Sequence, residues 1–414
     1  MRILFLSHRL PYPPNKGDKI RSFWELKTLS RRHEIDLFCF YDDEADRKEV
    51  ANIHRYCRSC YVEPLSGLRS RGRAAVGLIR REPFSTAYFR SRSMTRQIAD
   101  SFKARTHDLM FVFGSAMAPY AEQHPHVPKV LDMVDVDSDK WEQYAVQGRP
   151  PLSWLWKLES RRLGEYESRL VRSFANTLIS TEAECRLLRS KCATGKITVL
   201  QNSLDTAYFS PQESNSFPQI QSLKPYVIFT GTMDYPPNVQ AVEFFCSEIL
   251  PHVVARVPRI KFVIAGRNPS KRVLDLAANS SVRITGAVPD IRPYLQNAAV
   301  AVAPMKIARG VQNKILEALA MGLPVVATPL TAGALPRELA FHVEEESDPR
   351  QFGERVVKHL IGPAQREDIQ RAAVKRFFDE LRLSEQLEEC VSAAAGRIPS
   401  SRERSDMSEV QLSY

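Results

Sequence analysis

The sequence predicts an α/β protein built from two doubly wound domains, each a parallel sheet covered by helices. At 414 residues the chain is too long for one typical core. It contains many short β-rich runs that are apolar throughout, as strands buried on both faces of a parallel sheet are. Segments with apolar residues at helical spacing separate these runs. The alternation occurs in two successive series, which indicates two domains.

The first series occupies the predicted N-terminal domain, residues 1–209. Helical patterns separate its strands, for example RSFWELKTLSRR at residues 21–32 and a long basic amphipathic helix at residues 153–175. The predicted strands are RILFLS (2–7), EIDLFCF (34–40), SCYVEPL (59–65), DLMFVFG (108–114), PKVLDMV (128–134), NTLIS (176–180) and KITVLQN (196–202).

The second series occupies the predicted C-terminal domain, residues 225–396, after a Ser-, Pro-, Gln- and Asn-rich stretch at 210–224 that predicts a linker. One long helical pattern, NVQAVEFFCSEILPHVVARV, begins at Asn238. The polar residues 397–414 are predicted to be disordered and to carry no chemistry. The predicted strands are YVIFTGT (226–232), KFVIAG (261–266), VRITGAV (282–288), AVAVAPM (299–305) and PVVATP (324–329).

The composition is that of an ordinary soluble protein. No apolar run approaches the roughly 18–20 residues needed to cross a bilayer. The opening MRILFLSHRL is too short for the apolar region of a signal peptide, so we expect a cytoplasmic protein. The seven cysteines are scattered and odd in number, which fits a reducing compartment. Cys57 and Cys60 form a lone C-x-x-C with no second metal-ligating pair, and we interpret them as structural.

The net charge of +10 is unevenly spread along the chain. Residues 66–105 hold ten Arg or Lys against two acids, Glu82 and Asp100. Such a patch suits anionic lipid, a phosphorylated substrate or nucleic acid, and a solvated basic surface is the alternative. No nucleic-acid-binding module accompanies the charge, so we expect no nucleic-acid partner.

The predicted C-terminal domain has glycines at the ends of three strands, and ligands of open α/β sheets bind beyond such carboxyl ends. Singly, each glycine fits an ordinary turn. Together they predict one edge of the sheet where a flat ligand lies on the backbone. The residues at these ends are Gly231, Gly266, Arg267, Gly286, Val288 and Pro289.

The stretch KIARGVQNKILEALAMGLPVVAT, residues 306–328, predicts a phosphate site. Gly310 opens a loop before a helix, whose first N–H groups and dipole attract an anion. Lys314 in the first turn adds a cation. Glu317 follows one turn later on the same face; it would repel phosphate but can accept hydrogen bonds from ribose hydroxyls. The pair therefore predicts a nucleoside diphosphate, and an ordinary ion pair on a helix surface is the alternative.

The predicted N-terminal domain offers an anion-binding loop and a histidine. The loop SHRLPYPPNKGDKIRS, residues 7–22, follows the first strand and leads into a helix that begins near Asp18. Gly17 permits close approach of the backbone to an anion there, and a plain strand-to-helix turn is the alternative. His8 lies where the first strand ends, and we interpret it as an acceptor contact or as a loop histidine.

With these pieces the sequence resembles the retaining glycosyltransferases of family 4, which have the GT-B architecture of two Rossmann-like domains facing across a cleft. The resemblance covers most of residues 225–390. The loop SHRLPYPPNKGDKIRS and the stretch DMVDVDSDKWEQYA (132–145) narrow it to sugar transferases associated with bacterial exopolysaccharide gene clusters. The matching pieces of the second half are GTMDYPPN, FVIAGRNP, the stretch from ITGAVPD to LPVVAT (284–328) and RFFDELRLSEQLEE (376–389).

The resemblance implies a C-terminal domain that binds a nucleotide-diphosphate sugar, with Lys314 on the diphosphate and Glu317 on the ribose. Gly17 would lie beneath the diphosphate from the other domain, against which the last helix of the chain can pack. Many family members carry an earlier glutamate, facing the sugar, where this chain has Arg309. Arg309 therefore puts the donor sugar in question and would serve the phosphates or an acidic sugar.

The resemblance also implies that no cofactor and no metal takes part, because a helix dipole and cations neutralise the leaving diphosphate. Asp135 and Asp137 form an Asp-x-Asp, a motif that binds manganese in the other major glycosyltransferase fold. Here we expect it to face the acceptor sugar, with helix capping as the alternative. The diphosphate would leave with help from Lys314 and from Arg267 or Arg309. The acceptor would then attack from the same face and give its proton to a phosphate oxygen.

The sequence thus predicts transfer of a sugar from a nucleotide-diphosphate donor to a glycan or lipid-linked acceptor, with retention, in exopolysaccharide biosynthesis. A sugar-nucleotide 2-epimerase of the same fold is one alternative, for which we find no set of acid/base residues. A non-catalytic nucleotide-sugar-binding subunit is the other, and Arg309 favours it. The basic residues 66–105 and a lipid-linked acceptor together predict peripheral contact with the anionic inner membrane face.

Overall fold

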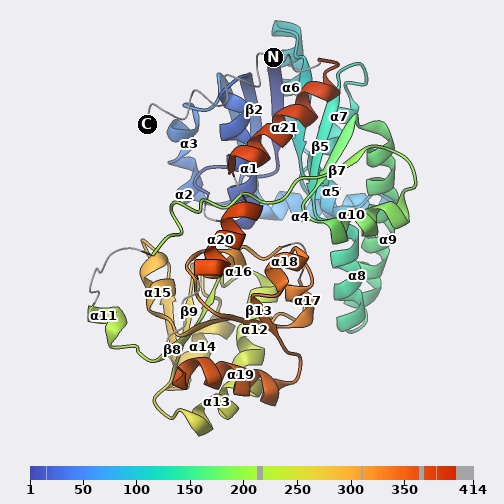
Figure 1. Cartoon of the computed structure of the whole chain (residues 1–414). Coiled ribbons are helices and arrows are strands. Elements are labelled where there is room, and N and C mark those ends of the chain that lie inside the picture. Colours follow the sequence, from blue (N-terminus) through green and yellow to red (C-terminus); the bar gives the residue numbers. More distant parts are fainter. Residues whose placement is uncertain (15, 212–217, 309–310, 363–367, 379, 398–414) are drawn as a thin grey trace, which may run out of the picture. The chain divides into compact units, whose positions relative to one another are not determined.

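The structure is a computed structural model that describes residues 1–14, 16–211, 218–308, 311–362, 368–378 and 380–397. The chain forms two compact units (Figure 1). Unit 1 consists of Met1–Gln201 and Leu381–Tyr414, and unit 2 of Asn202–Glu380. Each unit contains one parallel sheet with helices packed against it, so the predicted α/β class with two doubly wound sheets is confirmed.

The sheet of unit 1 has seven parallel strands in the order β3-β2-β1-β4-β5-β6-β7. The order reverses between β1 and β4, and ligands of doubly wound sheets bind at the carboxyl ends beside such a switch point. The seven runs predicted as strands all form strands. Their bounds are β1 Arg2–Ser7, β2 Glu34–Tyr41, β3 Ser59–Pro64, β4 Leu109–Phe113, β5 Lys129–Val134, β6 Asn176–Ile179 and β7 Ile197–Val199.

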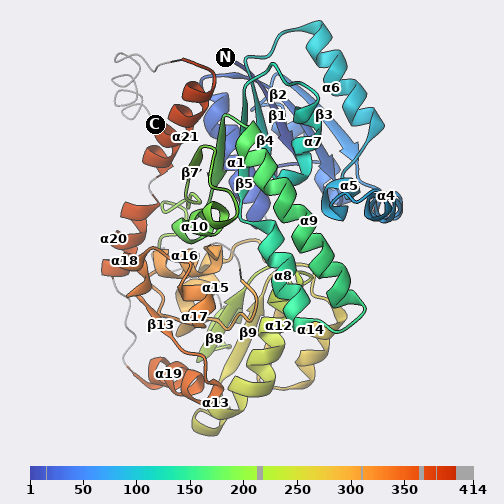
Figure 2. The same cartoon turned by 90° about the vertical axis from the view of Figure 1, so that its right-hand side faces the viewer.

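Helices cover both faces of this sheet because alternate residues of each strand point to opposite sides. Ile3 and Phe5 of β1 share a core with Leu26, whereas Leu4 and Leu6 belong to the core of the other face. Figure 2 shows α8 and α9 side by side as a hairpin. The helices are α1 Gly17–Ser30, α2 Glu44–Arg47, α3 Val50–Ile53, α4 Gly67–Ile79, α5 Phe84–Tyr88, α6 Arg92–Ala104, α7 Ala118–Glu122, α8 Asp137–Gln147, α9 Leu152–Ser173 and α10 Glu182–Lys191.

The last described helix, α21 (Glu380–Ala394), belongs to the core of unit 1 although its sequence follows unit 2. Leu383 and Leu387 are buried in the core that contains Ile3 and Phe5. Figures 1 and 2 show α21 beside the blue and green elements of unit 1. Polar contacts add to the packing: the His33 ring lies 2.8 Å from the Glu388 carboxylate, and the Gln386 amide donates to the Val199 carbonyl over 2.8 Å.

The sheet of unit 2 has six parallel strands in the order β10-β9-β8-β11-β12-β13. Five of them were predicted; β13 was not, because it has three residues, VEE, and little apolar character. The strands are β8 Tyr226–Thr230, β9 Lys261–Ala265, β10 Val282–Gly286, β11 Val300–Ala303, β12 Val325–Ala327 and β13 Val343–Glu345. The helices are α11 Pro218–Gln221, α12 Pro236–Phe244, α13 Leu250–Arg256, α14 Lys271–Asp275, α15 Arg292–Asn297, α16 Asn313–Ala320, α17 Pro329–Ala332, α18 Arg337–Ala340, α19 Pro349–Ile361 and α20 Asp368–Phe377.

The helix predicted from Asn238 is interrupted. A π-helical turn, Phe245–Ile249, separates α12 from α13. Pro251 follows directly, and a proline inside a regular α-helix clashes with the preceding turn and lacks an N–H donor. The wider turn accommodates the proline without ending the helical path.

The division between the units also differs from the predicted linker. It falls between Gln201 and Asn202 rather than within residues 210–224. Ile220 and Leu204 are buried in the core of unit 2, because both are large apolar side chains next to the sheet. The stretch therefore packs on unit 2 in part, while residues 212–217 and the predicted disordered tail from residue 398 lie outside the described residues.

Candidate functional site

Lys314 in the first turn of α16 is held by three groups of unit 2. Its ammonium donates a hydrogen bond to the Asn238 side-chain oxygen over 2.7 Å. It lies 4.2 Å from the centroid of the Phe229 ring and 3.8 Å from the Met305 sulfur. These contacts fix the cation at the carboxyl end of β8, where α16 begins.

The sequence of α16 explains why Lys314 and Glu317 are presented together. Ile315, Leu316 and Leu319 are buried in the core beneath the helix. Lys314 and Glu317, three residues apart, are only partly buried and share a different side of the helix. The N–H groups of Ile315 and Leu316 donate to the Gln312 carbonyl, and those of Asn313 and Lys314 before them have no partner within the helix. A cation, a carboxylate and unused amide donors therefore meet at one helix terminus.

Burial shifts the pKa of Lys314 and of Glu317 more than the two groups shift each other's pKa. Burial lowers the pKa of Lys314 to about 7, although the charge of Glu317 raises it. Burial likewise raises the pKa of Glu317 to about 7, against the effect of Lys314. Within the described part of the chain no hydrogen bond reaches the Glu317 carboxylate. Its oxygens are available to hydroxyl donors of a ligand.

Two glycines allow the loops after β8 and β9 to cross next to Lys314. Gly231 and Gly266 have φ values of +156° and +154°, which side chains rarely tolerate. A Cβ on Gly266 would lie 1.7 Å from the Gly231 carbonyl oxygen, and one on Gly231 would lie 2.7 Å from the Asn238 amide nitrogen. The amide of Asn238 donates in turn to the Thr232 carbonyl over 2.9 Å. The structure thus brings Gly231, Gly266 and Lys314 around Asn238.

Arg267 has unused donors at the same strand end. Its Nε and one Nη are buried and have no hydrogen-bond partner among the described residues. Buried donors without partners are costly, so a missing acceptor is the simplest explanation. An anionic ligand would supply one.

Other predicted donor-side residues are less closely tied to Lys314. Val288 is half-buried and Pro289 is exposed in the loop after β10. No contact between either of them and Lys314 is found in the described ranges. Arg309 and Gly310 lie outside the described residues, so their predicted roles on the phosphates stay predictions.

In unit 1, His8 follows β1 and is fixed by a carboxylate and two rings. Its Nε2 lies 3.2 Å from Asp18, which also accepts a hydrogen bond from Arg9 over 2.6 Å. The ring stacks on Phe113 at 5.7 Å between centroids. Burial raises the pKa of Asp18, but the hydrogen bond from His8 and the charge of Arg9 hold it well below its usual range. His8 thus lies in the loop after β1, beside the switch point, and contacts Asp18 and Phe113 there.

Asp135 follows a strained residue at the end of β5. Val134 has φ +64°, a rare conformation for a β-branched residue and one that occurs at functional sites. Burial raises the pKa of Asp135, against a hydrogen bond from the Ser180 hydroxyl at 2.7 Å. Gly17 begins α1, and a Cβ there would meet no atom within 4 Å. Both residues thus lie at carboxyl-end loops of unit 1, as predicted.

The neighbouring Asp137 is the first residue of α8 and pairs with Lys140 at 2.5 Å. The residue before the helix is Val136, whose side chain makes no capping hydrogen bond, and the N–H of Ser138 in the first turn donates to Glu167 over 3.0 Å. Neither Asp135 nor Asp137 is therefore the N-cap residue of α8. Among the described residues no group of three or more His, Cys, Asp or Glu is arranged to hold a metal ion.

A buried charge cluster beneath these loops escaped sequence reasoning. Arg21 of α1 pairs with Asp132 of β5 through two hydrogen bonds and donates to the Leu200 carbonyl over 2.8 Å. Glu25 lies 3.4 Å from the same guanidinium. Burial and the charge of Asp132 raise the pKa of Glu25 well above its usual value. The one hint of this cluster in the sequence was Asp132, a charged residue inside the apolar run PKVLDMV. Asn238 was likewise visible only as part of GTMDYPPN.

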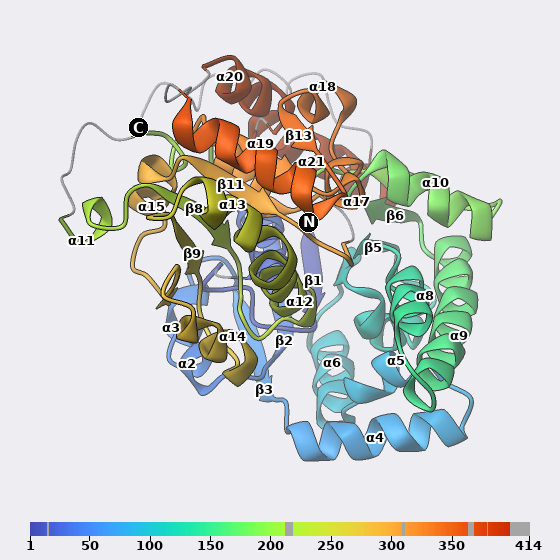
Figure 3. The same cartoon turned by 90° about the horizontal axis from the view of Figure 1, so that it is seen from below.

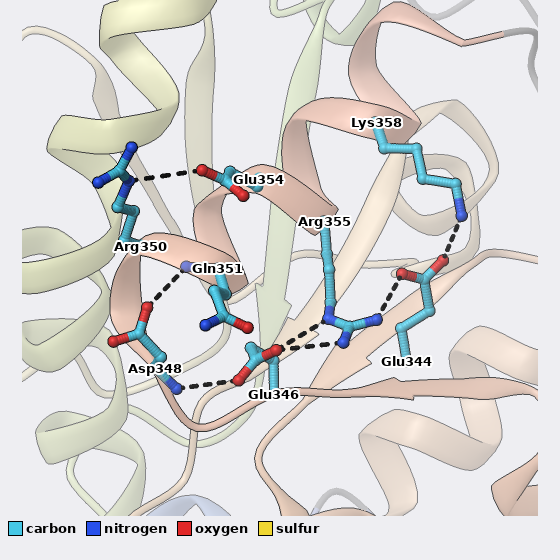
Figure 4. A pocket seen from close by; sticks show the side chains of 8 residues that line it. All are labelled: Glu344, Glu346, Asp348, Arg350, Gln351, Glu354, Arg355 and Lys358. Carbon is cyan, nitrogen blue, oxygen red and sulfur yellow. Dashed lines mark hydrogen bonds and ion pairs between the residues drawn. The ribbon is translucent and has the colours of Figure 1, made fainter.

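A surface hollow of unit 2 has a different character (Figure 4). It encloses about 590 Å³ beside β13 and the start of α19. Its charged side chains already pair: Arg355 binds Glu346 and Glu344, and Lys358 binds Glu344. These pairs leave the hollow without the unpaired donors that Arg267 offers, so we do not assign the ligand to it.

Sequence comparison relates the stretch that carries Lys314 to a known family. Residues 224–361 match the family model of glycosyl transferases group 1. A protein described as "Uncharacterized 44.6 kDa protein in cps region" from Klebsiella pneumoniae is 21% identical over 343 residues. That alignment covers 80% of this chain and 83% of the relative.

Comparison with solved structures shows that the two units have the GT-B fold. HepE of Anabaena, crystallised with UDP-glucose, is 12% identical with a TM-score of 0.63, covering 95% of this chain and 100% of HepE. Sucrose-phosphate synthase of Thermosynechococcus elongatus is 15% identical with a TM-score of 0.67, covering 94% and 98%. WaaG, a glycosyltransferase involved in lipopolysaccharide biosynthesis, is 16% identical with a TM-score of 0.60, covering 95% and 100%. At these identities the likeness establishes the fold.

Proposed function

We propose that this chain transfers a sugar from a nucleotide-diphosphate donor to a hydroxyl of a glycan or lipid-linked acceptor, with retention at the anomeric carbon. The observation that carries the proposal is Lys314, fixed by Asn238 beside a Glu317 carboxylate that no described group engages. The pair lies in the stretch that matches the family model of glycosyl transferases group 1. This combination suits a ligand with both a diphosphate and vicinal hydroxyls.

On the donor side each group has a distinct task. Lys314 and the unpaired nitrogens of Arg267 neutralise the diphosphate, together with the N–H groups at the start of α16. Glu317 accepts hydrogen bonds from the ribose. Gly231 at the end of β8 lets the ligand approach the backbone closely. UDP-glucose in the HepE complex supports a ligand of this class.

The reaction breaks the bond between the anomeric carbon and the diphosphate oxygen. The departing negative charge is stabilised by cations and amide donors that are in place beforehand, which is the most effective form of electrostatic catalysis. The acceptor oxygen then bonds to the anomeric carbon on the face that the diphosphate has left. Its proton passes to a diphosphate oxygen, so no protein base and no metal ion takes part. Gly17 at the start of α1 lets the backbone of unit 1 approach an anion closely.

On the acceptor side, His8 and Asp135 of unit 1 bind the sugar hydroxyls. His8 is ordered by Asp18 and Phe113, and Asp135 is presented by the strained Val134. The Klebsiella pneumoniae relative in a cps region and the lipopolysaccharide role of WaaG support an acceptor in surface-polysaccharide synthesis. We place the reaction on the cytoplasmic side. In the described ranges no helix is long and apolar enough to cross a bilayer.

A donor screen tests the proposal directly. The purified chain is incubated with radiolabelled UDP-, GDP-, dTDP- and ADP-sugars, with and without a lipid-linked glycan extract, in buffer containing EDTA. We expect nucleotide release with one base, a product of retained anomeric configuration by NMR, and no loss of activity to EDTA. Interconversion of the donor sugar without transfer would indicate an epimerase. Tight donor binding without turnover would indicate a binding subunit.

A further inference from the structure

Helix α4 is firmly seated on unit 1 through one of its faces. Arg73 donates to the Ser70 hydroxyl over 2.7 Å and to the Tyr88 carbonyl over 3.3 Å. A Cβ on Gly77 would lie 2.4 Å from the Cβ of Ala87, so α4 approaches α5 as closely as a glycine permits. The Leu78 carbonyl accepts a hydrogen bond from Arg162 of α9 over 2.9 Å. These contacts fix which face of α4 points away from the unit.

The outward face of α4 is apolar. Leu68 and Ile79 are each 83% exposed and Val76 is 47% exposed. At 100° per residue these three side chains fall on one side of the helix, opposite Ser70 and Gly77. A surface helix of a soluble protein normally turns such residues inward. We call the outward residues the α4 stripe, which consists of Leu68, Gly72, Ala75, Val76 and Ile79.

Arginines flank the α4 stripe on both sides. Arg71 lies along one edge, and Arg69 and Arg80 lie along the other. Arg81 follows the last turn, and residues 67–81 contain no acid. Figure 3 shows α4 as a straight helix at the margin of unit 1, away from the strands. An apolar centre with cations on both edges is the pattern of helices that lie in a membrane interface.

We propose that the α4 stripe docks unit 1 on an anionic phospholipid surface. Leu68, Val76 and Ile79 enter the boundary between head groups and acyl chains, and the flanking arginines bind the phosphates. The proposal goes beyond sugar transfer and does not depend on it, since it concerns only where the chain resides. It also assigns the membrane contact expected of the basic residues 66–105 to one helix, α4, whose apolar side chains reach the boundary between head groups and acyl chains.

Charge and geometry favour a bilayer over other occupants. A second copy of the chain would bring its own arginines against these, and like charges across an interface oppose association. An acidic protein surface would satisfy the arginines but would leave the apolar centre against polar groups. A bilayer presents phosphates at the level of the arginines and acyl chains directly beneath them.

Vesicle sedimentation of the full chain tests the docking. The probes are vesicles of phosphatidylcholine alone and of phosphatidylcholine with 30 mol% phosphatidylglycerol, at about 50 mM and 500 mM salt. We expect binding to the anionic vesicles at low salt and a large loss at high salt. Leu68→Ser with Ile79→Ser should lower the partition coefficient roughly tenfold or more. Arg71→Gln with Arg80→Gln should lower it about 25-fold, about fivefold for each charge.

Matched control variants show whether vesicle binding depends on the α4 stripe itself or on any exposed apolar side chain and any positive charge. Phe341→Ser removes an apolar side chain of unit 2 that is 81% exposed, and Lys103→Gln with Arg350→Gln removes the same charge elsewhere. Both should bind vesicles like the wild type, and circular dichroism should show all variants folded. Absence of wild-type binding to anionic vesicles at low salt would overturn the proposal. So would equal losses from the Phe341 variant and the α4 variant. Donor turnover without vesicles, measured in parallel, shows separately whether the transfer reaction stands.

Discussion

At the scale of single residues, Lys314 carries a charge that the apo protein disfavours. Burial lowers its pKa to about 7, and the hydrogen bond from its ammonium to Asn238 does not restore the usual value. A group that costs stability in the free protein is often one that a ligand needs. The same applies to Glu317, whose pKa burial raises to about 7.

Lys314→Met keeps most of the side-chain volume and removes the charge. The unfolding free energy should change by no more than about 1 kcal/mol, because the lost charge was poorly solvated. Turnover should fall at least about 100-fold, since one lost donor to a leaving group costs about 3 kcal/mol. Denaturant unfolding and donor turnover are the two measurements. Lys271→Met, at an exposed position of α14, is the control and should change neither. Near-normal turnover of Lys314→Met would remove Lys314 from the site.

The pH dependence of kcat/KM should be bell-shaped with a maximum near pH 7. Above about pH 7 Lys314 loses the proton that attracts the diphosphate, and below about pH 7 Glu317 gains one and no longer accepts from the ribose. Glu317→Gln should flatten the acid limb and leave the alkaline limb in place. It should also weaken binding of the bare nucleoside diphosphate in calorimetry. An acid limb that persists in Glu317→Gln would assign that limb to another group.

At the scale of elements, the loops that follow the strands contain glycines with two different roles. Gly266 is required by the protein itself, because a Cβ there would overlap the Gly231 carbonyl. Gly17 has open space beside it, so no described residue demands a glycine at that position. The first glycine belongs to folding, whereas our proposal gives the second a functional role, the close approach of a ligand to the backbone.

Paired alanine variants separate these two roles. Gly266→Ala should lower the unfolding free energy by about 3 kcal/mol or more, through overlap and an unfavourable φ. Gly17→Ala should leave the unfolding free energy within about 0.5 kcal/mol and lower donor turnover. Thermal unfolding and turnover report the two effects. Full activity of Gly17→Ala would contradict the contact between α1 and the diphosphate.

The elements that could be predicted from the sequence are those whose own residues show the pattern of their burial. The long apolar runs became strands within a few residues of the predicted bounds, because burial on both faces leaves an unmistakable pattern. β13 could not be found in this way, since three residues with two carboxylates carry no such pattern. Asn238 and the Arg21–Asp132 pair were also out of reach. Their partners are 76 and 111 residues away in sequence, and nothing local records such a contact.

At the scale of the whole molecule, the chain passes between the two units twice, near Gln201 and near Glu380. The sequence resemblance implied that the last helix can pack on the N-terminal domain, whereas periodicity alone does not reveal which sheet a helix covers. The structure places Leu383 and Leu387 in the core of unit 1. Unit 1 is therefore discontinuous in sequence, and unit 2 is inserted within it.

Leu387→Ala should destabilise unit 1 by about 2–5 kcal/mol, as expected for a leucine that is fully buried. The effect should be confined to unit 1, so that two-step denaturation shows an earlier transition for one unit only. Hydrogen exchange that reports β1 separately from β8 can assign it. The control is Glu389→Ala, at a neighbouring position that is exposed. Equal loss of protection in both sheets would argue against separate units.

Because α21 is the last helix of unit 1 to be translated, its position also determines when unit 1 can finish folding during synthesis. A ribosome that has released residues 1–201 has made the whole seven-stranded sheet of unit 1 but not the helix that shields Ile3 and Phe5. Roughly 180 further residues must be translated, which takes about 10–35 s at typical elongation rates. During that interval the nascent sheet exposes an apolar face, whereas unit 2 can complete its own core as soon as it emerges. Unit 1 thus completes its core only when α21 emerges, and chaperone occupancy on the nascent chain should fall only after residues 380–394 have left the ribosome.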